Sequence, residues 1–317
     1  MQKKENAKLN QFFNKINIRL DYFLNSKIYN RKGYYYIEKP IGKNNDFITA
    51  PEISQMFGEI IGLYLYFNWK TKLNCKFNLI ELGPGKGTLF SDIARSVFKF
   101  PEFLKQAKII FIEINKNLKK EQKKIIKNIN LKNVSWSEKI NLKSSIPSII
   151  YSNEFFDCFP VRHFVFKDKW YEKYVEFDEK DKRYFFINKE VKKNSLKNLL
   201  KSYEKKGLCE ISFQRNKYFE KICKYISKNG GLFFTIDYGY IEKINNFTLQ
   251  AIQNHKYSYV LDNIGSKDIS SHVNFRELIN IAKINNLYVE EFCTQREFLI
   301  KYVLQKEKKF YQKLMMQ

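Results

Sequence analysis

The spacing of apolar residues divides the chain into an N-terminal helical part and a longer part in which strands and helices alternate. Residues 7–29 place apolar side chains toward one side, which predicts an amphipathic helix followed by a Tyr-rich turn at 33–36. A second helix starts at a capping box, Thr49 with Glu52, and has Pro51 in its first turn. Its expected core face has apolar residues at helical spacing: Ile53, Met56, Phe57, Ile60, Ile61, Tyr64 and Leu65.

The opposite face of this second helix carries Gly58 and Gly62 one turn apart. Each glycine inside a helix costs about 1 kcal/mol relative to alanine, so something is expected to approach this face closely. A ligand and a tightly packed neighbouring helix explain the spacing equally well. Gln55 and Glu59 lie beside the glycines, and we expect them to line a substrate pocket.

From residue 77 the pattern changes to alternating strands and helices. Strands are predicted at 77–82, 109–112, near 134, at 149–152 and at 232–236, and helices at 88–100, 116–128 and 215–228. Strands separated by helices indicate a parallel, doubly wound sheet. Between the fourth and fifth strands, residues 161–190 alternate aromatic and charged side chains, which predicts inserted antiparallel strands. Farther on, Asn274 and Glu277 can cap a helix.

The predicted fold is therefore α/β, a Rossmann-like sheet with a helical N-terminal extension and a β-rich insertion. We expect a helical cover at 1–72, the first part of the α/β core at 73–160, an inserted substrate-side segment at 161–207, and the rest of the core with C-terminal helices at 208–317.

Composition narrows the class of protein. The 317 residues are 44% hydrophobic and 17% aromatic, too apolar for a disordered chain, and no stretch reaches the 18 or more uncharged apolar residues that a membrane span needs. The net charge of +24 suggests an anionic partner at first sight. However, the excess is mostly Lys and accompanies heavy use of Asn, Ile, Phe and Tyr, as in AT-rich genomes. We expect no nucleic-acid partner, with a functional basic surface as the alternative.

The cysteines and the N-terminus bear on the compartment. Five cysteines, without CxxC or CxH spacing, predict neither a disulfide framework nor a metal site and fit a reducing compartment. The first residues lack the apolar core of a signal peptide and the Arg/Ser-rich character of a transit peptide. The expected location is a bacterial cytoplasm, or the mitochondrial matrix if the protein is eukaryotic and processed.

The strongest local motif is a glycine-rich turn between the first predicted strand and the helix after it. Its glycines, Gly83, Gly85 and Gly87, follow a GxGxG spacing rather than the GxGxxG of nicotinamide folds. Glu81 precedes the turn and can take an ammonium group, and Glu113, after the next strand, can accept both hydroxyls of a ribose. A ligand with an amino acid at one end and a ribose in its middle is S-adenosylmethionine, whose carboxylate would lie at the helix start, Thr88.

Other interpretations of these residues stay open. The turn could bind phosphate with Lys86, although it lacks the GxxxxGK[ST] layout, and Glu113 could be a solvated charge. Trp136 and Ser137 follow the third strand, where an adenine would lie. Trp136 serves equally well as a stacking partner or as a core aromatic.

Several segments together resemble the MidA-like class I S-adenosylmethionine-dependent methyltransferases, a family that includes the complex I assembly-factor arginine methyltransferase of mitochondria. The resemblance runs from about residue 33 to 299 and rests on GYYY, DFITAPEISQMFGE, ELGPGKGTL, NEFFDCFPVRHF, GGLFFTIDYG, TLQAI with a following His255, GSKDISSHVNF and TQREFL. Small departures stand at Asn45, Lys86, Ser271 and Asn274, where the family usually has Gly, Arg, Thr and Asp.

The resemblance implies a Rossmann-like methyltransferase that acts on arginine in the 49-kDa-type subunit of respiratory complex I and aids its assembly. A methyltransferase acting on RNA or a small molecule, and an assembly chaperone that binds S-adenosylmethionine without catalysis, are the alternatives.

The residues expected to act on the substrate follow the fourth and fifth strands. Glu154 and Asp157 can grip a guanidinium, and Asn153 is expected to contact the cofactor. Asp237 is a further catalytic candidate, and His272 is expected in the substrate pocket. The alternative roles are turn formation and capping for the acids, and a structural role for the histidine.

Overall fold

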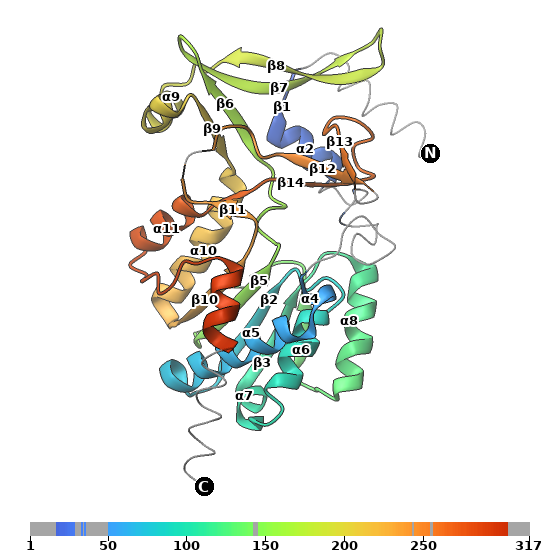
Figure 1. The fold of residues 1–317 in the computed structure, drawn as a ribbon, viewed down its shortest axis with the longest axis vertical. Helices are drawn as coiled ribbons and strands as arrows, with labels where there is room; N and C mark the ends of the chain where they lie inside the picture. Colours follow the sequence, from blue (N-terminus) through green and yellow to red (C-terminus); the bar gives the residue numbers. More distant parts are fainter. Residues whose placement is uncertain are drawn as a thin grey trace.

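The structure is a computed structural model that describes residues 17–28, 33, 35, 50–141, 145–242, 244–253 and 256–303, with only the backbone described at 204–206. It has two parts, one above the other in Figure 1: an α/β part around a parallel sheet and a part made mainly of antiparallel strands. The antiparallel part lies over one end of the parallel sheet.

The parallel sheet has five strands in the order β10-β5-β2-β3-β4. Their bounds are β2 Phe77–Leu82, β3 Ala107–Ile112, β4 Val134–Ser137, β5 Ser148–Asn153 and β10 Gly231–Ile236. The predicted strands and the parallel sheet are thus confirmed. The chain winds outward from β2 to β4 and then returns to β5 on the other side of β2, so the winding switches direction between β2 and β5. In open α/β sheets, ligands bind beyond the strand ends at such a switch point.

Helices cover both faces of this sheet (Figure 1). One face packs its Leu79 and Phe111 against α5 and α6, and the other packs Ile80 and Ile150 against α10 and α11. The helices are α4 Ala50–Ile53, α5 Gln55–Asn68, the π-helix η1 Trp69–Leu73, α6 Thr88–Ser96, α7 Pro101–Gln106, α8 Lys116–Ile129, α10 Phe213–Asn229 and α11 Phe275–Ile284. As predicted, the Asn274 side chain caps α11 by accepting from the Glu277 N–H.

The antiparallel part contains the strands predicted within 161–190. Its larger sheet has the order β1-β7-β6-β9, with β8 also paired to β7. The strands are β1 Ile18–Arg19, β6 Arg162–Phe166, β7 Trp170–Asp178, β8 Arg183–Glu190 and β9 Leu208–Ile211. The remaining elements are α2 Leu20–Ile28, α9 Asn194–Leu200, the 3-10 helix η2 Lys201–Lys206, and short strands β11 Gly239–Tyr240, β12 Gln250–Gln253, β13 Lys256–Ser258, β14 Asp268–Ser270 and β15 Val273–Asn274.

Two helix predictions need correction. Within the predicted helix 7–29, Ile18 and Arg19 form a strand because they pair with Val175 and Tyr174 of β7. The second predicted helix is broken at Ser54, whose extended backbone separates α4 from α5. Residues 7–16 and 29, Thr49, and two of the four residues of the Tyr-rich turn lie outside the described residues. The predicted domain boundaries stay predictions.

The break at Ser54 also changes the expected core face. Ile53 and Met56 are 75% and 57% exposed, so their assignment to the core was wrong. Phe57, Ile60 and Leu65 are buried as expected.

Close helix packing explains the two glycines of α5. A Cβ on Gly58 would lie 2.5 Å from Asp92 Cβ, and one on Gly62 would lie 2.9 Å from Ile93 Cα, both on α6. Of the two explanations left open by the sequence, the neighbouring helix is the one found.

Across the described part of the chain, no helix is both long enough and apolar enough to cross a membrane.

Candidate active site

The glycine turn lies at the carboxyl end of β2, at the switch point of the sheet. Gly83, Gly85 and Gly87 all have positive φ angles, of 64°, 57° and 90°. A Cβ on Gly83 would lie 2.9 Å from the Phe155 ring, so this position combines a left-handed backbone with a close neighbour. The turn ends where α6 begins at Thr88. At the edge of the parallel sheet that faces the antiparallel part, the glycines of this turn thus present backbone without side chains of their own.

Glu81, the acid before the turn, is buried in β2. Its Oε2 accepts a hydrogen bond of 3.0 Å from the Tyr151 hydroxyl. Burial raises the pKa of Glu81 to about 8; the Tyr151 bond opposes this rise, and the nearby Glu113 adds to it. A buried acid that gains its charge only with difficulty is suited to a cationic partner, such as the ammonium group expected there.

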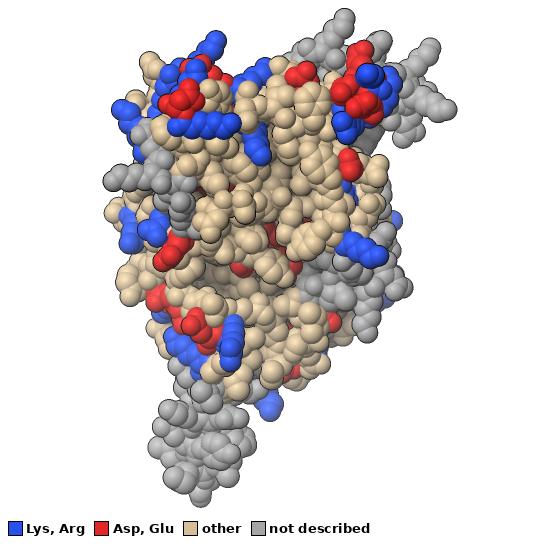
Figure 2. All heavy atoms as spheres, turned by 45° about the horizontal axis from the view of Figure 1, so that its top comes forward, with Lys and Arg blue, Asp and Glu red and all other residues tan. Residues whose placement is uncertain are grey.

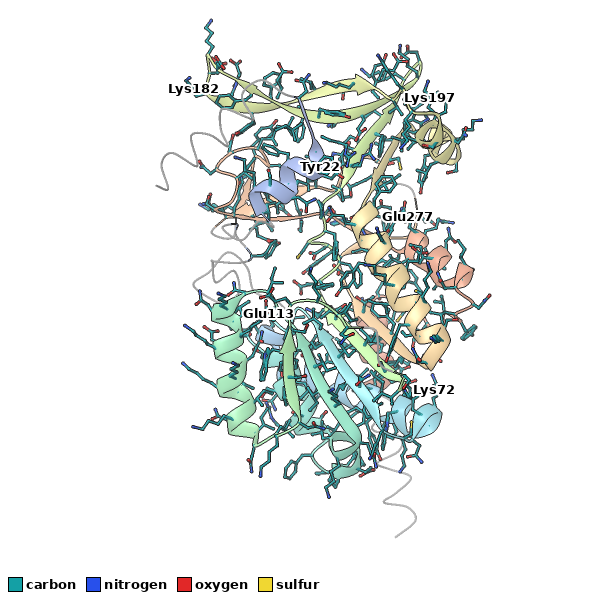
Figure 3. The ribbon with its side chains drawn as sticks, turned by 180° about the vertical axis from the view of Figure 1, so that it is seen from behind. Tyr22, Lys72, Glu113, Lys182, Lys197 and Glu277 are labelled. Carbon is teal, nitrogen blue, oxygen red and sulfur yellow. The ribbon has the colours of Figure 1, made fainter. Side chains whose placement is uncertain are left out.

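Glu113 follows β3 and lies at the edge of the α/β part that faces the antiparallel part (Figure 3). Its Oε1 accepts from the Asn115 N–H at 2.8 Å, and its Oε2 accepts from Gln122 Nε2 at 3.1 Å. Burial raises the pKa of Glu113, and these bonds oppose the rise. Because an ionised carboxylate can accept about four hydrogen bonds, the two oxygens retain capacity for a ribose diol.

Gln122 of α8 is a site residue that the sequence reasoning missed. It is fully buried, and its Nε2 donates to the Gly85 carbonyl at 2.6 Å as well as to Glu113. Its Oε1 accepts from Trp136 Nε1 at 2.8 Å. A single amide therefore joins three parts of the site: the glycine turn, the Glu113 carboxylate that we expect to bind ribose, and the Trp136 ring that we expect near adenine. Gln122 lies between Leu118 and Ile126 on the buried stripe of a Lys-rich helix, and a polar residue in that stripe was the available signal.

Trp136 and Ser137 end β4 next to this network. The Trp136 ring packs edge-to-face on Phe111 at 5.6 Å, so it serves as a packed aromatic whose N–H is satisfied. Ser137 Oγ donates to the Lys139 carbonyl at 2.6 Å. Contact of either residue with an adenine stays a prediction.

The short helix α4 is tied to the glycine turn by Glu52. Its Oε1 accepts from Thr88 Oγ1 at 2.5 Å, and its Oε2 lies 3.2 Å from Lys86 Nζ. Lys86, the candidate phosphate ligand of the alternative interpretation, is therefore held in an ion pair. The same helix also lies close to Glu154, because the Ala50 backbone N–H lowers the pKa of that carboxyl.

Glu154, Asp157 and Asp237 come together at the ends of β5 and β10. Asp237 Oδ2 accepts from the N–H groups of Phe155 and Phe156, at 3.1 and 2.8 Å. Glu154 Oε1 accepts from Asn153 Nδ2 at 3.0 Å. The φ angle of Glu154 is 50°, a left-handed conformation that is strained for a non-glycine residue and recurs at functional sites.

These acids repel one another in a buried setting. Burial, then Asp237, Asp268 and Glu154, raise the pKa of Asp157 well above its usual range. Burial likewise raises the pKa of Asp237 to about 7, although its backbone bonds and Arg215 oppose the rise. Burial also raises the pKa of Glu154. The charged form of this group is therefore disfavoured, and a cationic partner would stabilise it.

Asp268 and Arg215 also belong to this group, and the sequence reasoning named neither. Asp268 is buried on β14 and accepts a hydrogen bond from the Tyr35 hydroxyl. Arg215 of α10 is fully buried, and its Nη1 donates to the carbonyls of Phe156 and His272 at 3.5 and 3.4 Å. Both reach the site only through tertiary packing.

Unsatisfied polar atoms mark this group as a place for a ligand. Within the described residues, Asn153 Oδ1 and Asp237 Oδ1 are buried and have no hydrogen-bond partner. Such atoms are costly unless something pairs with them. Figure 2 shows the surface hollowed between the two parts, with acidic atoms visible inside the hollow and Lys and Arg around the margin.

The expected substrate-pocket residues are less closely tied to this group. Gln55 Nε2 donates to Glu59 Oε1 at 2.7 Å, and Glu59 lies 3.9 Å from Arg95. Their contacts among the described residues are thus with each other and with α6. His272 donates its backbone N–H to Thr248 Oγ1 at 2.8 Å and offers its carbonyl to Arg215. No group of three or more His, Cys, Asp or Glu side chains suited to a metal ion occurs in the described ranges.

Comparison with known protein families identifies the class of enzyme. A family model described as "Putative S-adenosyl-L-methionine-dependent methyltransferase" matches residues 60–293, which is most of the chain. The chain belongs to this family. Its members take S-adenosylmethionine as cofactor. Two features of this chain fit such a ligand: the glycine turn and the unpaired side-chain oxygen of Asn153.

Curated relatives of the family carry a more specific name. Protein arginine methyltransferase NDUFAF7, mitochondrial, of Homo sapiens is 29% identical over 277 residues, covering 80% of this chain and 62% of the relative. The Drosophila melanogaster homologue is 28% identical over 279 residues, covering 79% of this chain and 63% of the relative. The chain thus spans less than two thirds of the length of these relatives.

Two solved structures of bacterial proteins have a similar fold. A Burkholderia thailandensis protein with bound S-adenosyl-homocysteine superposes with a TM-score of 0.73 at 18% identity, covering 85% of this chain and 72% of that chain. A second Burkholderia thailandensis structure gives a TM-score of 0.69 at 17% identity, covering 85% of this chain and 71% of that chain. At such identities the likeness concerns the Rossmann-like fold alone.

Proposed function

We propose that this methyltransferase transfers methyl groups to arginine side chains of a protein. The observation that carries the proposal is the group formed by the buried Asp157 and the partly buried Glu154 and Asp237 beyond the ends of β5 and β10, next to the glycine turn. A guanidinium is a planar cation whose N–H groups match carboxylates in pairs. The name of the NDUFAF7 relatives adds support.

We assign the cofactor to the glycine turn, with Glu81 at its ammonium group and Glu113 at its ribose. Gly83, Gly85, Gly87 and Thr88 would face its carboxylate end, Trp136 and Ser137 its adenine, and Asn153 its centre. S-adenosylmethionine supplies a methyl group that its sulfonium already activates. The protein must therefore hold the attacking nitrogen in line with the methyl carbon and the sulfur. Positioning of this kind can lower the activation barrier by roughly 7–11 kcal/mol.

The raised pKa values suit this task. The surroundings of these acids disfavour their charged form, and an arriving guanidinium opposes this effect because it favours the charged carboxylates. Methylation of a protonated guanidinium releases one proton. Glu154 or Asp157 would accept it, while Asp237, bound to two backbone N–H groups, orients the loop that carries both.

The proposed substrate is the 49-kDa-type subunit of respiratory complex I, whose assembly the modification would aid. The location would be the mitochondrial matrix in a eukaryote, in line with the relatives' names, or the cytoplasm in a bacterium.

Incubation of the purified protein with methyl-labelled S-adenosylmethionine and the cognate 49-kDa-type subunit, followed by mass spectrometry, tests the proposal. We expect label on arginine. Glu154→Gln and Asp157→Asn should each lower the rate about 100-fold or more. Asp168→Asn, an exposed change of the same kind at the turn between β6 and β7, should leave it unchanged.

Three outcomes would replace the proposal. Label on RNA or on a small molecule would assign another substrate class. Assembly of complex I that persists in both acid variants, with methyl transfer abolished, would assign a chaperone that binds S-adenosylmethionine without needing catalysis.

A further inference from the structure

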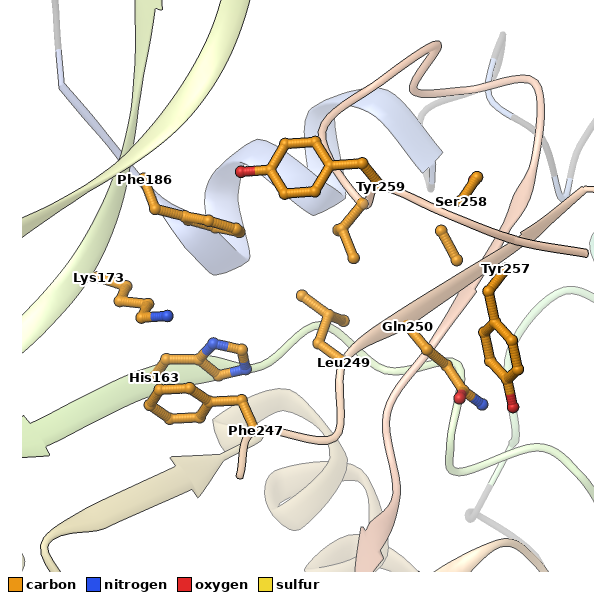
Figure 4. A pocket seen from close by; sticks show the side chains of 11 residues that line it. His163, Lys173, Phe186, Phe247, Leu249, Gln250, Tyr257, Ser258 and Tyr259 are labelled. Atoms are coloured by element: carbon orange, nitrogen blue, oxygen red, sulfur yellow. The ribbon is translucent and has the colours of Figure 1, made fainter. Parts of the chain in front are cut away.

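A second cavity lies in the antiparallel part, away from the glycine turn. Its volume is about 360 Å³. Its walls come from β6, β7, β8 and the segment that runs through β12 and β13 (Figure 4). The lining residues are His163, Lys173, Phe186, Phe247, Leu249, Gln250, Ala251, Tyr257, Ser258, Tyr259 and Val260. The size falls within the range of small-molecule sites.

The walls of this cavity are mostly aromatic, and a lysine enters among them. The Lys173 ammonium lies 4.5 Å from the centre of the Phe247 ring and 5.1 Å from that of Phe186. Burial lowers the pKa of Lys173, and no carboxylate of the described residues lies within 4 Å of its Nζ. Within the described ranges the contacts of this half-buried ammonium are with aromatic faces, so it retains the capacity to bind an anion.

His163 supplies a second polar group at the same end of the cavity (Figure 4). Only 2% of the residue is exposed, and its ring stacks on Phe247 with centres 4.0 Å apart. Its Nε2 lies 2.8 Å from Glu210 Oε2, whereas its Nδ1 has no hydrogen-bond partner among the described residues. When the imidazole carries both protons, Nδ1–H is left to donate to a ligand.

The surrounding charge favours an anion. Glu210 is already engaged by His163 and by the N–H and hydroxyl of Thr248. Behind the opposite wall, the buried Lys267 donates from its Nζ to Ser258 Oγ at 2.9 Å and to the Tyr259 carbonyl. The Lys173 ammonium and the His163 Nδ1 therefore face an apolar space, and Lys267 places a second ammonium behind Ser258 and Tyr259.

We propose that this cavity is a ligand site, separate from the cofactor turn, for a small aromatic carboxylate. Lys173 and His163 Nδ1 bind the carboxylate, and the rings of Phe186, Phe247 and Tyr259 enclose the aromatic body. Charge-assisted hydrogen bonds fix the acid end, and burial of the ring contributes the apolar share of the affinity. This inference does not depend on the arginine substrate.

The cavity is connected to the candidate active site by hydrogen bonds. Thr248 Oγ1 donates to Glu210 and accepts from the His272 N–H. The neighbouring Ser271 N–H donates to the Asp157 carbonyl at 2.9 Å. A series of contacts thus runs from His163 through Glu210 and Thr248 to the backbone of Asp157.

Calorimetric titration of the full chain with 2-naphthoate, in the presence of saturating S-adenosyl-homocysteine, tests the proposal. We expect saturable binding that is at least tenfold tighter than binding of the neutral isostere 2-naphthamide. Lys173→Met should weaken binding of the carboxylate at least tenfold, and Lys173→Arg should largely retain it. Lys182→Met, the same change at the exposed tip of the β7–β8 hairpin (Figure 3), should have no effect.

Three results would overturn the proposal: no saturable binding of 2-naphthoate, equal affinity for the acid and the amide, or equal binding by the Lys173→Met and Lys182→Met variants. Thermal unfolding midpoints of the variants show whether a loss of binding reflects a loss of fold. If Lys173→Met lowers the midpoint, the acid-to-amide ratio in the wild-type chain decides.

Discussion

Single residues decide how the cofactor end of the site is held. Gln122 binds the Gly85 carbonyl, Glu113 and Trp136 with one buried amide, so the three groups cannot shift independently. Glu81 is held in a setting that disfavours its charge. Each of these arrangements has a measurable consequence.

Replacing Gln122 by Met keeps the length of the side chain but removes all three hydrogen bonds. The Gly85 carbonyl and Glu113 would lose a donor, and we expect the Kd for S-adenosyl-homocysteine to rise about tenfold, or ~1.4 kcal/mol. Isothermal calorimetry measures this change, with Lys124→Met on the exposed side of α8 as the control. Unchanged affinity in Gln122→Met would show that the amide does not position the cofactor.

The raised pKa of Glu81 predicts how cofactor affinity depends on pH. Below about pH 8 the carboxyl of the free protein is mostly protonated, and an ammonium group requires it ionised, so binding releases a proton. The Kd for S-adenosylmethionine should therefore fall as pH rises from 6 to 7, by up to about tenfold per pH unit, and level off near pH 8. Glu81→Gln should bind more weakly and lose this slope; the same slope in the variant would exclude Glu81 as its source.

At the scale of elements, the alternating apolar segments predict the parallel sheet well because its central strands β2 and β5 are buried along nearly their whole length. The pattern cannot predict β1, because Ile18 and Arg19 become a strand only through pairing with β7, far along the chain. The break at Ser54 has no local signal either. It nevertheless separates α4, whose Glu52 reaches the glycine turn, from the packed helix α5.

The same limits apply to the site. The acids after β5 and β10 can be predicted because parallel strands end at one edge. Gln122 could have been found from its place on an apolar stripe. Asp268 and Arg215 arrive from distant segments, and the left-handed φ of Glu154 has no signal in its residue type.

Packing of α5 on α6 gives a prediction at this scale. Gly62→Ala gains about 1 kcal/mol of helix propensity, but its Cβ would meet the Ile93 backbone at 2.9 and 3.0 Å. The backbone of Ile93 cannot move aside as the end of a flexible side chain can. We therefore expect the clash to outweigh the gain in helix propensity and to lower the free energy of unfolding by about 1–3 kcal/mol. Urea titration measures it, with the exposed Met56→Ala as control; a stabilised Gly62→Ala would refute the packing explanation.

At the scale of the whole molecule, the net charge is positive, whereas carboxyl groups gather at the candidate site. The chain carries +24, yet the hollow between its two parts contains acidic atoms (Figure 2). This contrast agrees with the proposal that the substrate presents a cationic group. The antiparallel part lies over the strand ends, so both cofactor and substrate would meet where the two parts face each other (Figure 1).

A crystal structure of this chain with S-adenosyl-homocysteine would test the central claim most directly. The account predicts the ligand along the glycine turn, with its amino group at Glu81, its ribose hydroxyls at Glu113, and its sulfur toward Glu154 and Asp157. A ligand bound elsewhere, or one at the turn that contacts neither Glu81 nor Glu113, would contradict it.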